Sequence, residues 1–155
     1  MDDSEYISNS LTSAHKGTVP YRHWFLKNVL SYNSVEEIIN LPVPVPDVIH
    51  DGWRANYKED RIFFDPEMCS RHEVCRDVVA AFKSKFVKSA IERCCGIDLS
   101  ESHLRIEYTL DTDGFYLKPH KDLDVKLFSL MVYLSSDPEL SDSGTDMYDA
   151  DLNHV

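Results

Sequence analysis

The chain has 155 residues with 27 acidic and 16 basic side chains, a formal net charge of −11, and 43% hydrophobic residues. This composition is typical of one globular domain and excludes a fibrous or low-complexity chain. The sequence contains neither an apolar stretch near the roughly 20 residues of a membrane span nor a signal-like leader, so we expect a cytoplasmic protein without a membrane partner. Because an acidic chain repels phosphate backbones, nucleic acid is not an expected partner.

Much of the negative charge lies in the last part of the sequence. No Lys or Arg follows Lys126. Six carboxylates follow it: Asp137, Glu139, Asp142, Asp146, Asp149 and Asp151. The simplest interpretation of this pattern is a solvated acidic edge or tail.

The first third of the chain is predicted to hold one short helix. Residues 1–19 are polar and rich in Ser and Thr, so we expect a disordered lead-in. Residues 21–30 are apolar enough to dock on a core. Residues 34–37 (SVEE) have the form of a capping box, which predicts a helix that starts at Ser34 and stops before the extended proline connector 42–46.

The strongest local pattern predicts one long helix in the middle of the chain. Ser70 and Glu73 form a second capping box, and apolar residues recur at helical spacing up to Gly96. We expect this helix at about residues 71–94. Its inward-facing residues are Val74, Val78, Phe82, Phe86 and Ile91.

After this helix the sequence favours strands. Residues 104–110 alternate between apolar and polar side chains, and residues 111–114 are turn formers. Residues 115–120 then form an extended piece, 127–134 a nearly continuous apolar strand, and 145–149 a last strand-like piece. We therefore expect an α+β fold in which residues 20–155 form one domain, with helices over about 20–100 and strands over about 101–155.

One pair of residues has the chemistry of a metal site. His120 and Asp122 are two residues apart, so in extended backbone both side chains lie on the same face. With a second histidine, they would make the two-histidine, one-carboxylate set that leaves three positions open on ferrous iron. Because the H-x-D pattern is common by chance, a surface histidine beside a solvated carboxylate remains an alternative.

The order of features around this pair resembles a known family. From Arg105 to Tyr148 the chain has a strand, the turn and H-x-D segment GFYLKPHKD, the apolar strand LFSLMVYL and a strand led by Gly144. This order is similar to the front half of the double-stranded β-helix, or jelly roll, of iron(II)- and 2-oxoglutarate-dependent oxygenases. It is closest to prolyl-hydroxylase-like and uncharacterised bacterial members, whose preceding helices also come in a similar order.

The resemblance implies a fold, an activity and site residues. It implies N-terminal helices packed on a jelly roll, with His120 and Asp122 as the first two iron ligands. Tyr108 and Tyr133 match positions where family members often present a hydroxyl to 2-oxoglutarate. The strand period gives Tyr133 separate support, because it shares a potential pocket face with Ser129 and Met131. The implied reaction is a dioxygenase reaction that hydroxylates a substrate and releases succinate and CO2. The expected substrate is a small molecule or a glycan-type compound.

The sequence departs from the family pattern at its end. The family needs a second histidine and then a basic residue for the 2-oxoglutarate carboxylate, but only His154 follows Asp122, at a shorter spacing than usual, and no Lys or Arg follows Lys126. The strand count also falls short of the roughly eight in a jelly roll. We therefore expect a jelly roll that is incomplete at the C-terminus, in a truncated or degenerate oxygenase, with open strand edges that permit self-association.

Two further interpretations remain open. One is a non-catalytic jelly-roll protein that serves as a binding module or scaffold. The other is a zinc-stabilised interaction module, although the spacing of its candidate ligands suits zinc poorly and idle, reduced thiols explain them better. The candidate zinc ligands are Cys69, His72, Cys75, Cys94 and Cys95.

Overall fold

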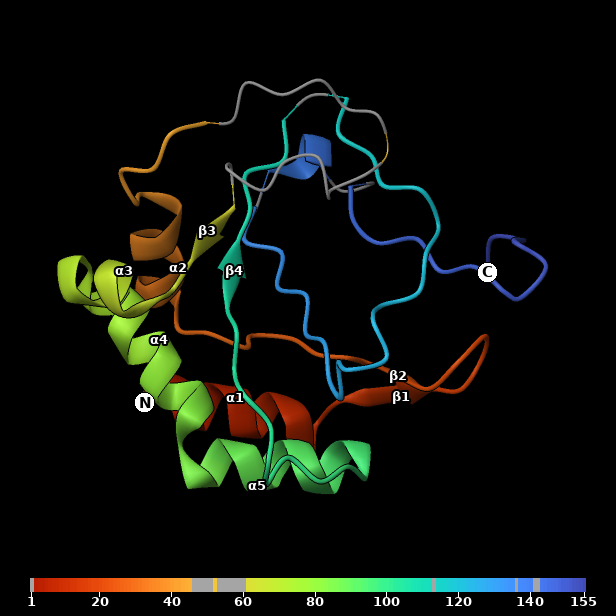
Figure 1. The fold of residues 1–155 in the computed structure, drawn as a ribbon, viewed down its shortest axis with the longest axis horizontal. Helices are drawn as coiled ribbons and strands as arrows, with labels where there is room; N and C mark the ends of the chain where they lie inside the picture. Colours follow the sequence, from red (N-terminus) through yellow and green to blue (C-terminus); the bar gives the residue numbers. More distant parts are fainter. Residues whose placement is uncertain (1, 46–51, 53–60, 113, 136, 141–142) are drawn as a thin grey trace.

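The computed structural model describes residues 2–45, 52, 61–112, 114–135, 137–140 and 143–155. Within these ranges the fold is α+β, with five α-helices and two small antiparallel sheets. The helices occupy the left and lower parts of Figure 1, whereas most of the chain after strand β4 is irregular backbone. No helix in these ranges is long and apolar enough to cross a bilayer.

Helix α1 (Asp3–Thr12) occupies the region where we expected a disordered lead-in. Asp2 and Glu5 form a capping box at its start, and the buried side chains of Ile7 and Leu11 face helix α5. Two apolar residues four positions apart are a weak signal in the sequence. They are sufficient here because α5 supplies the surface that they cover.

A buried carboxylate connects α1 to the next helix. Asp3 accepts hydrogen bonds from the Ser31 backbone N–H at 2.8 Å and from the Ser34 hydroxyl at 2.6 Å. Helix α2 (Tyr32–Ile39) has Ser31 as its N-cap, whose hydroxyl accepts from the Ser34 N–H at 3.1 Å. The helix thus begins earlier than predicted, since Ser31 and not Ser34 holds the extended, capping conformation. Pro46, at the end of the predicted connector, lies outside the described residues.

The single helix predicted at 71–94 is instead three helices: α3 (Pro66–Arg71), α4 (Glu73–Lys83) and α5 (Lys85–Cys95). The backbone is extended at His72 and at Ser84, and the Ser84 hydroxyl accepts from the Val87 N–H at 3.2 Å. A serine that can cap a new helix allows the chain to turn without losing hydrogen bonds. The predicted end is confirmed, because Gly96 has φ +66° at the C-cap.

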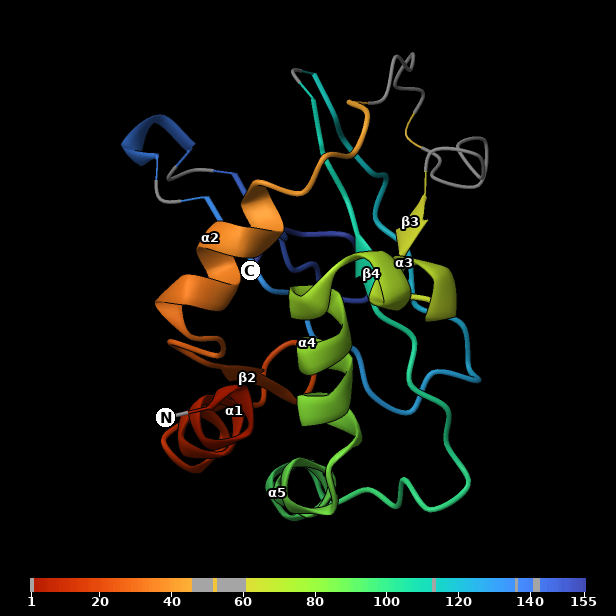
Figure 2. The same ribbon diagram turned by 90° about the vertical axis from the view of Figure 1, so that its left-hand side faces the viewer.

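Helix α4 joins two hydrophobic clusters, and Figure 2 shows it running from α3 down to α5, with α1 beside α5. Val74 and Val78 belong to the cluster under α2, while Ala81 belongs to the cluster between α1 and α5. The cluster between α1 and α5 consists of Ile7, Leu11, Val29, Ala81, Val87, Ala90, Ile91, Cys95 and Leu99. The cluster under α2 consists of Leu30, Ile38, Leu41, Phe64, Val74, Cys75 and Val78.

The two sheets are small. Strand β1 (His15–Gly17) pairs with β2 (His23–Phe25) in a hairpin that docks through Trp24, and β3 (Ile62–Phe63) pairs with β4 (Glu107–Tyr108). Arg61, before β3, contacts both carboxylate oxygens of Glu107 at 2.8 and 2.5 Å. Docking of residues 21–30 is confirmed in part, because Val29 and Leu30 are buried, whereas Tyr21 and Phe25 are exposed.

The predicted jelly roll is wrong: the described residues contain no double-stranded β-helix. Of residues 104–110 only β4 is a strand, and residues 115–120 and 127–134 form none. Residues 145–149 contribute one isolated bridge, Tyr148 to His154. In the predicted turn, Gly114 has φ +79°, but Asp113 lies outside the described residues.

Residues 127–134 explain why a strand pattern failed to give a strand. Their side chains alternate in part: Phe128, Leu130 and Leu134 pack on the two clusters, and Met131 and Tyr133 are exposed. Val132, on the face of Phe128 and Leu130, is exposed as well. A strand also needs a neighbouring backbone for its ladder of hydrogen bonds. Here the inward side chains pack on helices instead. The alternation in the sequence therefore reflects which side chains are buried, although no sheet forms.

Candidate functional site

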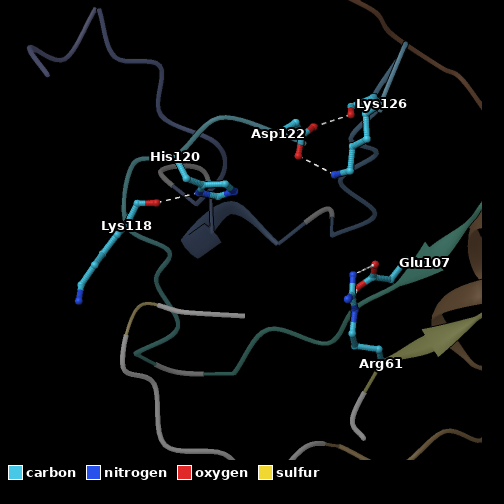
Figure 3. A network of polar contacts seen from close by, with 7 residues as sticks. Arg61, Glu107, Lys118, His120, Asp122 and Lys126 are labelled. Carbon is cyan, nitrogen blue, oxygen red and sulfur yellow. Dashed lines mark hydrogen bonds and ion pairs between the residues drawn. The ribbon is translucent and has the colours of Figure 1, made fainter. Parts of the chain in front are cut away.

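His120 lies on an exposed loop after Lys118 and is held in one tautomer by the backbone. Its Nδ1 is 2.8 Å from the Lys118 carbonyl oxygen (Figure 3). A carbonyl can only accept, so Nδ1 donates the hydrogen, and the neutral ring carries its free lone pair on Nε2. The exposed ring therefore presents to solvent the nitrogen that can bind a metal.

Asp122, on the same loop, is an ionised carboxylate held by two donors. Lys126 Nζ lies 2.5 Å from Oδ1, and the Ser129 hydroxyl donates to Oδ2 at 2.6 Å. The bond from Lys126, then the bond from Ser129, and then the charge of Lys126 hold the pKa of Asp122 below its usual range. The carboxylate is thus charged well below neutral pH and fixed in orientation.

The structure brings His120 and Asp122 onto one loop, but not on the strand face expected from their spacing. The Lys126 N–H donates to the Leu123 carbonyl at 2.9 Å, which closes a turn directly after the pair. In Figure 3 the carboxylate of Asp122 faces Lys126, with the His120 ring further along the loop. Among the described residues no group of three His, Cys, Asp or Glu side chains is arranged to hold a metal.

His154, the candidate third ligand, belongs to another part of the structure. Its Nε2 lies 3.1 Å from Asp146 Oδ1, and its ring meets the Tyr148 ring edge-on at 5.6 Å. Together with the bridge from Tyr148 to His154, these contacts tie the imidazole into the loop of residues 146–155. In this arrangement His154 supplies no ligand to the loop of His120.

The two tyrosines are also placed separately. Tyr108, in β4, is half-buried against the cluster under α2, and this burial raises its pKa. The Tyr133 hydroxyl bonds to the Thr145 hydroxyl. In the part of the chain that the structure describes, no hydrogen bond or ion pair joins either tyrosine to His120 or Asp122. Their contact with 2-oxoglutarate stays a prediction.

Cys75 and Cys95 have the properties of protonated thiols. Burial foremost raises the pKa of Cys75 and of Cys95 to about 11 each, with a further contribution from the neighbouring Cys69 and Cys94. Cys94 Sγ also donates to the Leu11 carbonyl at 3.6 Å, in the packing between α1 and α5. Since zinc binds thiolates, these surroundings favour the interpretation as idle thiols.

Two residues that contact the site were not assigned to it from the sequence. Ser129 had a usable signal, because it lies on the face of residues 127–134 that we predicted to line a pocket. Lys126 stands four residues after Asp122, but this spacing indicates a contact only where the loop turns, as it does here. The contacts of both residues with Asp122 depend on that turn.

Comparison of the chain with models of protein families, with curated proteins and with solved structures found no match.

Proposed function

We propose that the chain is an iron(II)- and 2-oxoglutarate-dependent dioxygenase, with His120 and Asp122 as two of its metal ligands. A small molecule or a glycan-type compound is the proposed substrate. The observation that carries the proposal is the bond from His120 Nδ1 to the Lys118 carbonyl, which leaves Nε2 as the ligand atom. The metal and the reaction class come from the similarity of the sequence of residues 105–148 to the family pattern, although β4 is the only expected strand that the described residues form.

Both side chains have hydrogen bonds of the kind that support metal ligands. Metal-binding histidines commonly donate their other ring N–H to a carbonyl or carboxylate, as His120 does. Asp122 is ionised, and its hydrogen bond from Ser129 resembles the outer-sphere support of ligating carboxylates. Imidazole and carboxylate together suit ferrous iron, so the donor types of this pair fit the proposed metal.

His120 and Asp122 are the two residues of the described chain that fit the proposed iron site. Neither His154 nor the tyrosines contact the pair, and no cation follows Lys126 to bind the distal carboxylate of 2-oxoglutarate. When bound, iron and 2-oxoglutarate supply the oxidising chemistry for hydroxylation of a C–H bond. The residues of this chain hold the ligands: the Lys118 carbonyl orients the His120 ring, and Ser129 orients the Asp122 carboxylate.

The free thiols support the proposed cytoplasmic location. All four cysteines are unpaired. Disulfides persist in oxidising compartments and are rare in the cytosol, so unpaired cysteines are typical of a reducing compartment.

Anaerobic addition of ferrous iron and 2-oxoglutarate to the whole chain tests the proposal. We expect the visible charge-transfer absorption of the ternary complex, and succinate after admission of oxygen. Both signals should be lost in His120→Ala and Asp122→Ala and kept in His103→Ala and Asp124→Ala, which change exposed residues of the same types. Metal binding without succinate would favour a non-catalytic binding protein, and equal signals in all four variants would overturn the site.

A further inference from the structure

The β1–β2 hairpin is a basic surface on an acidic protein. Residues 6–35 contain no Asp or Glu, although the chain as a whole has a formal charge of −11. Lys16, Arg22 and Lys27 are exposed, and among the described residues none of them pairs with a carboxylate. The Lys16 ammonium lies 5.9 Å from the centre of the Trp24 ring. The hairpin therefore carries positive charge that the described chain does not neutralise.

The outer face of the same hairpin is apolar. The rings of Tyr21, which precedes β2, and of His23 and Phe25 in β2 follow one another, with centroids 6.0 and 5.1 Å apart. The His23 ring covers Gly17, where an added Cβ would lie 2.0 Å from Nε2, so a larger residue would have to displace the ring. Tyr21 is 53% exposed and Phe25 57%. A row of rings edged by cations suits a partner that is both acidic and apolar.

The loop of residues 146–155 has these two properties. Asp149 accepts the Asp151 and Asn153 N–H groups at 2.9 Å each, which holds the loop in a compact turn. The turn exposes the carboxylate of Asp151, and Leu152 is 67% exposed. No cation is present in the loop. Its charge and apolar surface are thus complementary to those of the hairpin.

We propose that the hairpin of one copy of this chain binds the loop of residues 146–155 of a second copy, and the reverse. Both surfaces lie on the right-hand side of the molecule in Figure 1. A twofold axis beside them can therefore form the two contacts at once, which makes a closed dimer. At physiological ionic strength charges are screened beyond about 8 Å. Direct contacts between opposite charges then outweigh the more distant repulsion between the two acidic bodies.

The oligomeric state of the whole chain, measured by sedimentation velocity over a range of concentrations, tests this proposal. We expect a dimer at physiological ionic strength whose dissociation constant rises about tenfold or more in high salt, because the contacts are ionic. A hairpin variant (Lys16→Glu, Arg22→Glu and Lys27→Glu) and a loop variant (Asp146→Lys and Asp151→Lys) should each be monomeric.

Mixing the two variants gives the decisive result. In a mixed dimer, the acidic hairpin of the hairpin variant faces the basic loop of the loop variant. The unaltered hairpin of the loop variant faces the unaltered acidic loop of the hairpin variant, so we expect this mixed dimer to form. A control variant with the same change of charge elsewhere, Lys83→Glu, Lys85→Glu and Arg93→Glu, should dimerise like the unaltered chain. A monomeric unaltered chain at every concentration, or a mixture that stays monomeric while both variants remain folded, would overturn the proposal.

Discussion

Replacement of Lys126 by methionine should tighten metal binding at Asp122. The ammonium lies 2.5 Å from Oδ1, with the two side chains 36% and 44% exposed. It thus occupies the side of the carboxylate that a metal ion would share. Lys126→Met removes the charge and keeps a side chain of similar length, while the hydrogen bond from Ser129 remains.

The magnitude follows from two contributions. An exposed ion pair of this kind is worth up to about 1 kcal/mol. In the variant the metal no longer has to break this pair in order to bind Asp122. In the unaltered chain, the Lys126 ammonium that the metal has displaced still repels it. At about 8 Å from a divalent ion, this repulsion is about 1 kcal/mol in water. Together they predict about 1–2 kcal/mol, or roughly fivefold to thirtyfold tighter binding in the variant.

Calorimetric titration with Mn²⁺ at neutral pH and low salt measures the effect. The gain should shrink at high salt, because both contributions are partly screened. Lys121→Met is the matched control, since this exposed lysine is one residue from Asp122 and makes no hydrogen bond or ion pair with it. Binding to Lys126→Met that is equal to or weaker than binding to the unaltered chain would refute the argument that the ammonium competes with the metal.

Three further outcomes follow from the described contacts. Asp3→Ala should lower the free energy of unfolding in urea by about 2–3 kcal/mol, because the Ser31 N–H loses a charged, buried acceptor. Ser129→Ala should raise the pKa of Asp122 in an NMR titration. Because that pKa is lowered in the folded state, the stability it adds is present above the usual carboxyl pKa and is lost as pH falls through the lowered value. Cys75, with a pKa of about 11, should resist alkylation at neutral pH until the protein unfolds, as mass spectrometry would detect.

For each of these three predictions, a specific result would contradict the expected outcome. An unchanged urea midpoint in Asp3→Ala would show that α1 and α2 do not depend on the buried carboxylate, and Glu101→Ala, an exposed residue, gives the baseline. A titration of Asp122 that does not move in Ser129→Ala would contradict the hydrogen bond between them. Rapid alkylation of Cys75 in the folded protein would contradict its burial.

The helical part of the fold was partly predictable, because caps and apolar spacing are local signals. Gly96 ends a helix as expected, and Val74 and Val78 face a core. The division of the long helix at Ser84 was missed, since serine is common inside predicted helices and its capping role appears only when the chain turns there. Helix α1 was missed because its stability comes from α5, which is distant in the sequence.

The strand region shows the limit of periodicity. Alternation over residues 127–134 indicated the inward position of Phe128 and Leu130, but Val132 on the same face is exposed. It could not indicate a neighbouring strand, because pairing depends on distant backbone. In the candidate site, the position of His120 and Asp122 on one loop follows from their spacing in the sequence. The contact of Asp122 with Lys126, by contrast, depends on the turn between them.

Paramagnetic broadening by Mn²⁺ tests most directly whether His120 and Asp122 bind a metal together. Substoichiometric Mn²⁺ is added to the ¹⁵N-labelled chain, and backbone amide signals are followed by NMR. We predict selective broadening of residues 118–129, with none of this selectivity in His120→Ala or Asp122→Ala. Broadening centred on the acidic residues 137–151, or unchanged in the two variants, would contradict the account.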